Sequence, residues 1–266
     1  YTQRSGNWRN VFDGSTNFVR PRDSHGNWQT PYRPDTWGGS FTEGSAWHWT
    51  WCVYHDIAGL IDAMGGDQRF VERLYSVFVA EPTFDIGAYG HVIHEMTEMV
   101  LGGMGQYAHG NQPMQHFIYL YNYTSEPWKA QKWAREAMTR LYNGTERGYC
   151  GDEDQGQTSS WFVLSAMGLY AVCPGTDQYV LGSPLYPKVT LTFEDGKRLV
   201  IESENHSPQN VYIQSLWLDG REITRNYLTY AELTGGGHLK FVMGPEPNRS
   251  RGTSSESWPY SVSAER

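Results

Sequence analysis

Residues 157–193 read QTSSWFVLSAMGLYAVCPGTDQYVLGSPLYPKVTLTF, and their hydrophobic pattern changes halfway along. The apolar residues of 157–170 fit one helix, and the Pro174-Gly175 pair that follows ends it. Residues 188–193 alternate between polar and apolar side chains, which is the period of a strand with one buried face. We therefore expect the chain to change from helical to β-rich structure near residue 175.

Upstream of this point, helix patterns are separated by glycine-rich connections. One long helix is expected over residues 45–64, between Gly38-Gly39 and Gly65-Gly66, because its apolar residues recur at helical spacing. Further helices are expected over residues 67–79, 91–101, 113–121, 127–141 and 157–170. Helices joined in this way fit a helical hairpin array or an (α/α) barrel better than alternating strands and helices. They are too few for a complete (α/α)6 barrel, so we expect part of one over residues 1–175.

Downstream, the sequence predicts an antiparallel β unit over residues 176–266. Asp195-Gly196 is a hairpin turn between alternating segments at 188–193 and 199–202. The pattern continues over 211–218, 221–223 and 239–243. Residues 245–257 are polar and begin with two prolines, which is typical of a loop or tail. The expected fold class is therefore α+β.

The composition argues against several classes of protein. With 21 Lys and Arg against 29 Asp and Glu, the net charge of −8 does not suit a nucleic-acid binder. The sequence has no run of about 18 apolar residues, so we expect no membrane span. Aromatic residues make up 15% of the chain, which is too many for a disordered protein, and half-polar aromatic faces suit sugar sites. Cys52, Cys150 and Cys173 leave open one disulfide with a free thiol, or three reduced thiols.

The first residues carry no signal-peptide pattern. We therefore expect the start of the chain to be mature, trimmed or internal to a longer protein.

A first cluster of candidate functional residues lies at residues 41–49, which read FTEGSAWHW. Glu43 lies next to a glycine, directly ahead of the expected helix and among three aromatic residues. Burial against aromatic rings favours the protonated form of a carboxyl group, which suits a general acid. The alternative is a helix-start glutamate stabilised by the helix dipole.

A second cluster lies at residues 151–157, which read GDEDQGQ. Three consecutive carboxylates repel one another, so keeping all three ionised requires a cation, hydrogen bonds or a function. Asp152, Glu153 and Asp154 could activate water or gather a hard cation. The alternative is a solvated acidic turn.

A third cluster combines residues 106–113, which read QYAHGNQP, and His116 with His94, Glu95 and Glu98 upstream. The spacing of four residues lets His94 and Glu98 share a helix face. The second histidine of the zincin motif is absent, so the sequence supports zinc only weakly. The alternative is a set of hydrogen-bonded polar groups in the core.

Together these segments resemble glycoside hydrolase family 92, the calcium-dependent exo-acting α-mannosidases. The resemblance is carried by RPR at 20–22, TEGSAW at 42–47, VYHD at 53–56, GQYAHGNQP at 105–113, YLYN at 119–122, PWKAQ at 127–131, GDEDQGQ at 151–157 and LGSP at 181–184. It runs from about Arg4 to about Met243, in the family's order. It implies a whole protein with an N-terminal β-sandwich domain and an (α/α)6 barrel. The β-sandwich and the first barrel helices are then missing from this chain, and we expect them as its partner.

The resemblance also implies catalytic roles. Glu43 is expected to be the general acid and Asp154 the general base, with Asp152 beside it, in a reaction that inverts the anomeric configuration. An inverting pair holds its carboxyl groups about 6.5–9.5 Å apart to admit a water molecule. These residues are far apart in the sequence, so the fold has to bring them together.

Binding roles follow from the same resemblance. The residues expected to line the sugar site are His94, Glu95, His116 and Trp47. The family binds Ca²⁺, which contacts the sugar hydroxyls O2 and O3, and oxygen ligands suit this ion. The residues expected to hold it here are Asn111, Gln112 and Glu98.

The implied function is release of mannose from α-mannosides, in N-glycans or mannans, by a secreted or periplasmic enzyme. The linkage stays open, because Met114-Gln115 stand where some relatives carry a small residue and a second histidine. A catalytically silent carbohydrate-binding or structural fragment of the same fold is the alternative. The joint presence of Glu43, Asp152 and Asp154 favours the enzyme over this alternative. A barrel acting on another sugar is a weaker third hypothesis.

Overall fold

The computed structural model describes residues 1–265, apart from the side chains of Thr2 and Glu265. The chain forms two compact units. Unit one comprises residues 1–115, 149–154 and 262–265, and unit two comprises residues 116–148 and 155–261. These units divide the chain at other places than residue 175, and the expected domain limits of 1–175 and 176–266 stay a prediction.

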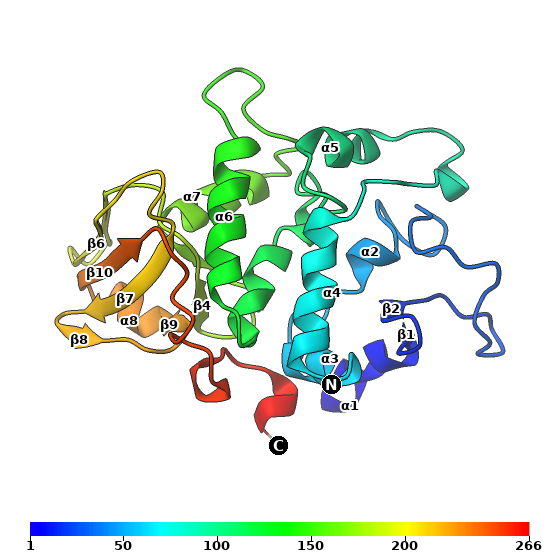
Figure 1. The fold of residues 1–266 in the computed structure, drawn as a ribbon, viewed down its shortest axis with the longest axis horizontal. Helices are drawn as coiled ribbons and strands as arrows, with labels where there is room; N and C mark the ends of the chain where they lie inside the picture. Colours follow the sequence, from blue (N-terminus) through cyan, green and yellow to red (C-terminus); the bar gives the residue numbers. More distant parts are fainter. Residues whose placement is uncertain (266) are drawn as a thin grey trace. The chain divides into compact units, whose positions relative to one another are not determined.

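Unit one is mainly helical (Figure 1). Its helices are α1 (Thr2–Ser5), α2 (Ala46–Trp49), α3 (Ile57–Ala63), α4 (Asp67–Val79) and α5 (His94–Gly102), with 3-10 helices η1 (Asn7–Asn10), η2 (Gly87–Tyr89), η3 (Gln112–Met114) and η6 (Val262–Glu265). Strands β1 (Phe12–Asp13) and β2 (Phe18–Val19) form a short antiparallel pair. Helix α4 has the predicted bounds, and it buries Phe70, Leu74 and Val77 along one face.

The prediction of one long helix over residues 45–64 is wrong. Residues 50–56 are not helical and separate α2 from α3. Asp56 caps the start of α3, where its Oδ1 accepts a hydrogen bond from the Gly59 amide at 3.2 Å. The same carboxylate accepts one from the Ser263 amide at 3.0 Å and pairs with Arg9 at 3.1 Å. A side chain that bonds nearby backbone in this way favours a helix start over a helix interior.

Unit two combines helices with two sheets. Its helices are α6 (Trp128–Arg140), α7 (Gln157–Ala166) and α8 (Tyr230–Thr234), with 3-10 helices η4 (Phe117–Tyr123) and η5 (Ser255–Ser257). Residues 113–121 were expected to be helical, and they form parts of two 3-10 helices, η3 and η4, in place of one continuous helix. Every residue of η4 is buried, so the segment lacks the polar face of a surface helix.

Helix α7 ends four residues earlier than predicted. Gly168 adopts a φ of +82°, which side chains rarely tolerate, and a Cβ there would lie 3.0 Å from Pro184 Cδ. The chain then enters β3 (Leu169–Tyr170), which pairs with β4 (Gln178–Leu181). Strand β9 (Tyr227–Thr229) completes this three-stranded sheet.

The second sheet has five strands in the order β5-β6-β10-β7-β8. They are β5 (Lys188–Thr192), β6 (Arg198–Glu204), β7 (Tyr212–Leu218), β8 (Arg221–Glu222) and β10 (Gly237–Gly244). The hairpin predicted at Asp195-Gly196 is confirmed, since β5 pairs with β6, and β7 pairs with β8 in a second hairpin. The expectation of a wholly antiparallel unit is wrong, because β10 runs parallel to β6. Strand β10 is antiparallel to β7 and inserts between two strands that follow each other in sequence.

Side chains of this sheet form the core of unit two. The buried residues include Leu199, Ile201, Leu216, Leu239 and Phe241. Their alternation along β6 and β10 matches the predicted period of two. The presence of helices and sheets in one chain confirms the α+β class.

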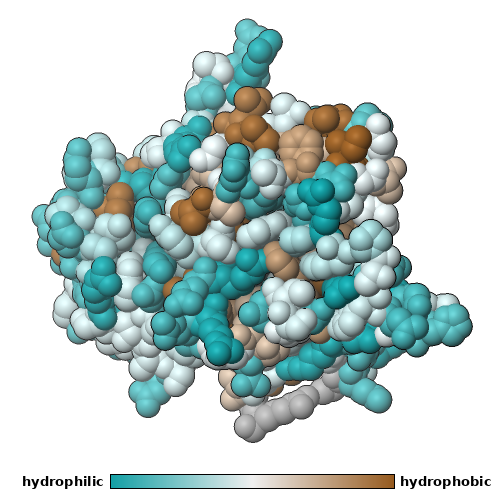
Figure 2. All heavy atoms as spheres, turned by 45° about the vertical axis from the view of Figure 1, so that its right-hand side comes forward, coloured by the Kyte–Doolittle hydropathy of each residue, from teal (hydrophilic) through white to brown (hydrophobic). Residues whose placement is uncertain are grey.

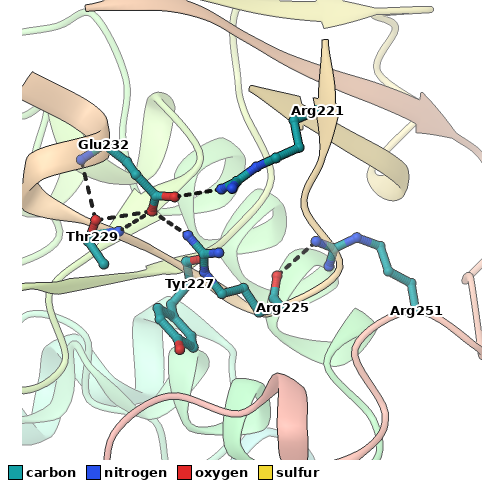
Figure 3. A network of polar contacts seen from close by, with 6 residues as sticks. All are labelled: Arg221, Arg225, Tyr227, Thr229, Glu232 and Arg251. Carbon is teal, nitrogen blue, oxygen red and sulfur yellow. Dashed lines mark hydrogen bonds and ion pairs between the residues drawn. The ribbon is translucent and has the colours of Figure 1, made fainter. Parts of the chain in front are cut away.

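A charged network fixes the connections around β9 (Figure 3). Glu232 accepts hydrogen bonds from Arg221 at 3.2 Å and from the Thr229 amide at 2.9 Å, and it also pairs with Arg225. Arg251 donates to the carbonyls of Ile223 and Arg225, both at 2.9 Å. The polar segment 245–257 is therefore anchored to the sheet through Arg251.

Figure 2 shows one face of the molecule, on which hydrophilic residues dominate and hydrophobic ones form separate patches. All three cysteines, Cys52, Cys150 and Cys173, are free thiols. Within residues 1–265, every helix is too short or too polar to cross a bilayer.

Candidate active site

Glu43 lies on a tight loop of unit one, residues 38–44. The Gly38 amide donates to the Gly44 carbonyl at 3.2 Å and closes the loop. The Glu43 amide donates to the Tyr89 hydroxyl at 2.8 Å. Contrary to the expected burial among aromatic rings, the Glu43 side chain is exposed. The backbone of the loop is thus fixed, while the carboxylate faces solvent.

His48 holds the backbone at the end of this loop. Its Nδ1 accepts a hydrogen bond from the Ser45 amide at 2.9 Å, and its Nε2 lies 2.9 Å from the Gln106 carbonyl. A carbonyl only accepts, so Nε2 carries the proton and His48 is neutral. Complete burial lowers the pKa of His48 to about 4, which keeps the ring neutral at ordinary pH.

Two adjacent amide side chains connect the loop of Glu43 with the acidic segment. Asn111 Nδ2 donates to the Glu43 carbonyl at 2.8 Å and lies 3.5 Å from Glu43 Oε2. Gln112 Nε2 donates to the Asp152 carbonyl at 2.8 Å. Residues from three separate stretches of the sequence therefore meet, as the candidate roles require.

Helix α5 adds a histidine and two further carboxylates. His94 Nδ1 lies 2.9 Å from Glu98 Oε1, which agrees with the predicted shared helix face. His94 Nε2 lies 3.4 Å from Glu95 Oε1 and 3.9 Å from Asp152 Oδ2. The hydrogen bond to Glu98 raises the pKa of His94, whereas burial raises the pKa of Glu98. His94 thus links α5 to the acidic segment.

Gly110 and Gly151, which the sequence analysis did not single out, allow the backbone of the acidic segment to lie close to Glu98. A Cβ at Gly110 would lie 2.7 Å from Glu98 Oε2, and one at Gly151 would lie 2.8 Å from the same atom. Both glycines flank residues of the site in the sequence, next to Asn111 and Asp152. Only residues without a side chain let the two backbones close over the Glu98 carboxylate.

The two candidate catalytic carboxylates share an unusual backbone conformation. Glu43 has a φ of +48° and Asp154 a φ of +47°. Left-handed backbone at residues other than glycine costs free energy. Asn17, Gln155, Asn205 and Asp219 also have positive φ values, so the conformation is not confined to the candidate site. The side chains of Asp152 and Asp154 are exposed, which leaves them accessible to a substrate.

Trp47 and His116 have surroundings that the sequence did not indicate. The Trp47 ring packs edge-on against Phe18 at 5.1 Å between centroids, and the guanidinium of Arg73 lies 4.2 Å from its centre. Trp47 is therefore partly a packing residue, and its neighbours come from β2 and α4. His116 belongs to unit two, where it is buried and packs edge-on against Phe117 at 4.9 Å.

The residues expected to hold calcium are Asn111, Gln112 and Glu98. Among the described residues, no three His, Cys, Asp or Glu side chains are grouped as metal ligands. The carboxylate atoms Glu95 Oε2 and Glu98 Oε2 are buried and accept no hydrogen bond from the described chain. A buried carboxylate oxygen without a donor suits a hard cation. The amide nitrogens of Asn111 and Gln112 donate to carbonyls. Their side-chain oxygens are the atoms that suit Ca²⁺, because this ion takes oxygen ligands.

Comparison with known proteins identifies the family. A profile of the glycosyl hydrolase family 92 catalytic domain matches residues 1–245. The chain therefore belongs to glycosyl hydrolase family 92.

Solved structures of this family resemble the chain closely. A family 92 inverting mannosidase of Bacteroides thetaiotaomicron is 51% identical, with a TM-score of 0.86, and the match covers 98% of this chain and 35% of that one. An α-mannosidase of the same organism, solved with mannoimidazole, is 36% identical with a TM-score of 0.87, over 96% of this chain and 33% of that one.

A curated relative is described as an uncharacterized secreted glycosidase of Arthroderma benhamiae. It is 29% identical over 99% of this chain and 34% of its own length. The chain thus spans about a third of the length of the relatives it matches.

Proposed function

We propose that the protein containing this chain is an exo-acting, inverting α-mannosidase. The chain would supply the later part of its (α/α)6 barrel and the β elements that follow. The observation that carries the proposal is the pair Asn111 and Gln112, whose amides bond the loop of Glu43 and the loop of Asp152. A 51% identical relative described as an inverting mannosidase supports the same chemistry.

In the proposed reaction, Glu43 donates a proton to the glycosidic oxygen as its bond to the sugar breaks. Asp154, with Asp152 beside it, removes a proton from the water that attacks the opposite face of the sugar. Asn111 donates a hydrogen bond to the Glu43 carbonyl, and the Glu43 amide donates one to the Tyr89 hydroxyl. These two bonds fix the backbone from which Glu43 reaches the leaving group. His94, Glu95, His116 and Trp47 are proposed to line the sugar site.

Calcium is part of the proposal. Asn111, Gln112 and Glu98 would hold it, and the bound ion would supply a positive charge for the sugar hydroxyls. The buried oxygen Oε2 of Glu98, which has no hydrogen-bond donor within the described part of the chain, supports this assignment. The missing N-terminal part of the protein is the proposed partner, and an extracytoplasmic location is proposed because a relative is described as secreted.

A catalytically silent fragment is the competing hypothesis. It would retain the fold but would have no need for two exposed carboxylates on loops that Asn111 and Gln112 bond. The joint presence of Glu43 and Asp154 on these loops supports the enzyme.

The direct test uses the full-length protein with an α-mannoside and follows the released sugar by ¹H NMR. An inverting enzyme releases β-mannose first, and the α-anomer grows later by mutarotation. Release of α-mannose first would contradict the assignment of an inverting pair. Absence of any hydrolysis would favour the silent fragment.

A second test addresses calcium. Chelation should abolish activity, Ca²⁺ should restore it, and Mg²⁺ should substitute poorly because it demands a tighter octahedral geometry. Added Ca²⁺ should also raise the melting temperature of the parent protein, and Glu98→Gln should remove this shift. The matched control is Glu72→Gln on the exposed side of α4, which should keep it. Full activity after exhaustive chelation would exclude the metal.

A further inference from the structure

Helix α6 of unit two carries a buried positive charge, the guanidinium of Arg135. The residue is only 6% exposed. Burial lowers the pKa of Arg135 to about 10, so the group stays charged at neutral pH. None of the carboxylates in the described part of the chain pairs with it. A buried charge is costly unless a counter-charge or hydrogen bonds compensate for it.

Neutral acceptors satisfy only part of this guanidinium. Its Nη2 donates to Ser183 Oγ at 3.1 Å and to the Pro184 carbonyl, and its Nη1 donates to the Ser207 carbonyl at 3.4 Å. The Nε atom is buried and has no acceptor among residues 1–265. One donor and the whole positive charge are therefore left without compensation.

Two further buried polar atoms of this region, Ser203 Oγ and His206 Nδ1, also have no hydrogen-bond partner among the described residues. Ser203, at the end of β6, donates its amide to the Pro187 carbonyl at 2.9 Å, next to the segment that Arg135 holds. Burial and the nearby charge of Arg135 lower the pKa of His206. A serine hydroxyl can donate a hydrogen bond, and so can Nδ1 in one tautomer of histidine.

The carboxylates of β6 do not supply the missing counter-charge. Side chains alternate between the two faces of a strand, so Glu202 and Glu204 lie on the face opposite to Ser203. Glu202 pairs with His238 at 2.8 Å, and Glu204 pairs with Lys240 at 3.0 Å. The inner face of the sheet is thus left with a cation and unpartnered polar atoms.

An ordered water and a small anion are the two occupants that would complete these hydrogen bonds. A water molecule could bond all three atoms, but it would leave the charge of Arg135 uncompensated. An anion would accept the same hydrogen bonds and neutralise the charge, and such charge-assisted bonds are the stronger ones. A monatomic anion suits three buried donors, whereas the oxygens of a phosphate would need more.

We propose that Arg135 Nε, Ser203 Oγ and His206 Nδ1 form a binding site for a small inorganic anion, with chloride as its occupant. The ion would connect α6 with the end of β6 and with the turn that follows this strand. It would therefore stabilise unit two, independently of the catalytic roles proposed for Glu43 and Asp154.

The test measures the melting temperature of the full-length protein in sodium chloride and in sodium methanesulfonate, at equal ionic strength and constant calcium. Methanesulfonate is too large for a buried site of this kind. Chloride should raise the melting temperature by about 2 °C, and the rise should saturate with concentration, because the ion binds only the folded state.

Variants of the site locate this effect. Ser203→Ala and His206→Phe each remove one donor and should raise the chloride concentration needed for half the shift about tenfold. Arg135→Met should abolish the shift. Arg140→Met, at the exposed end of the same helix, is the matched control and should keep it. If Arg135→Met does not fold, the two single-donor variants decide.

Equal melting temperatures in the two salts would overturn the site and would leave water as the occupant. An unchanged chloride response in both Ser203→Ala and His206→Phe would overturn it as well, because the ion would then bind elsewhere. Crystals of the full-length protein grown in sodium bromide give a direct view. An anomalous peak beside Arg135 Nε would support the site, and its absence there would contradict it.

Discussion

Glu98 of unit one and Glu232 of unit two are both half-buried carboxylates on helices, yet their surroundings are opposite. Both oxygens of Glu232 accept hydrogen bonds from arginine or threonine (Figure 3). Burial opposes the effect, but hydrogen bonds from Arg225 and Thr229 lower the pKa of Glu232. In Glu98 one oxygen lies next to His94, the other is buried and has no donor among the described residues, and burial raises the pKa of this carboxyl.

The difference separates a structural acid from a candidate functional one. A carboxylate with all its partners stabilises the fold, because its desolvation is offset by hydrogen bonds. A carboxylate that lacks a partner lowers stability, and it persists where a cation or a substrate completes its surroundings. We therefore expect substitutions of the candidate site's carboxylates to lower the rate of hydrolysis, and substitution of Glu232 to lower the stability of the fold.

The largest effect is expected at the proposed base. Asp154→Asn should lower the hydrolysis rate about 10²–10⁴-fold, because the amide cannot accept a proton from water. The loss should be similar for aryl and oligosaccharide substrates. Stability should change by about 0.5 kcal/mol or less, since the side chain is exposed. Kinetics and thermal melts on the same preparation measure the rate and the stability. A large loss of stability with an unchanged rate would show that Asp154 is a structural residue and not the base.

The next-largest effect concerns the free energy of unfolding at acid pH, which depends on the buried His48 next to the loop of Glu43. The pKa of His48 is about 4 in the folded protein and about 6.5 when unfolded, so the folded state disfavours the charged ring. Its contribution is complete above about pH 6.5 and falls progressively toward pH 4, where about 3 kcal/mol is lost.

Urea unfolding between pH 7 and pH 4 measures this loss. In His48→Gln the free energy of unfolding should depend less on pH between pH 7 and pH 4, whatever its value at pH 7. The control is His91→Gln, at an exposed histidine ahead of α5, which replaces a histidine that is not buried. It should retain the acid-dependent loss of stability. An identical slope in His48→Gln would show that His48 does not titrate as its burial predicts.

A smaller effect is expected at Glu232. Glu232→Gln weakens the bonds to two arginines and should cost about 2 kcal/mol of stability. The rate of hydrolysis should stay within twofold. Glu222→Gln, an exposed position on β8, is the matched control and should change neither. A loss of activity without a loss of stability would place Glu232 in the function of the protein.

Local patterns predicted several elements well. Helix α4 has its predicted bounds because one periodic apolar face lies between Gly66 and Ala80. The hairpin at Asp195-Gly196 was predicted because turn chemistry and strand alternation agree. The break before α3 was missed, because Asp56 is held by Arg9 and Ser263, which lie far away in the sequence.

In the candidate site, too, the sequence predicted contacts within one element but not contacts between separate elements. The spacing of His94 and Glu98 predicted their contact, since both lie on one helix. The packing of Trp47 against Arg73 and Phe18 could not be predicted, because it depends on how separate elements meet. The exposure of Glu43 was likewise missed, since neighbouring aromatic residues in a sequence need not cover the side chain between them.

The most direct measurement compares two leaving groups in Glu43→Gln. If Glu43 protonates the leaving oxygen, hydrolysis of an α-mannobioside should fall about 10²–10⁴-fold. An activated aryl α-mannoside needs little proton assistance, so its hydrolysis should fall far less, while Glu232→Gln leaves both rates unchanged. Equal losses on the two substrates in Glu43→Gln, or no loss on either, would contradict the assignment of Glu43 as the acid of this site.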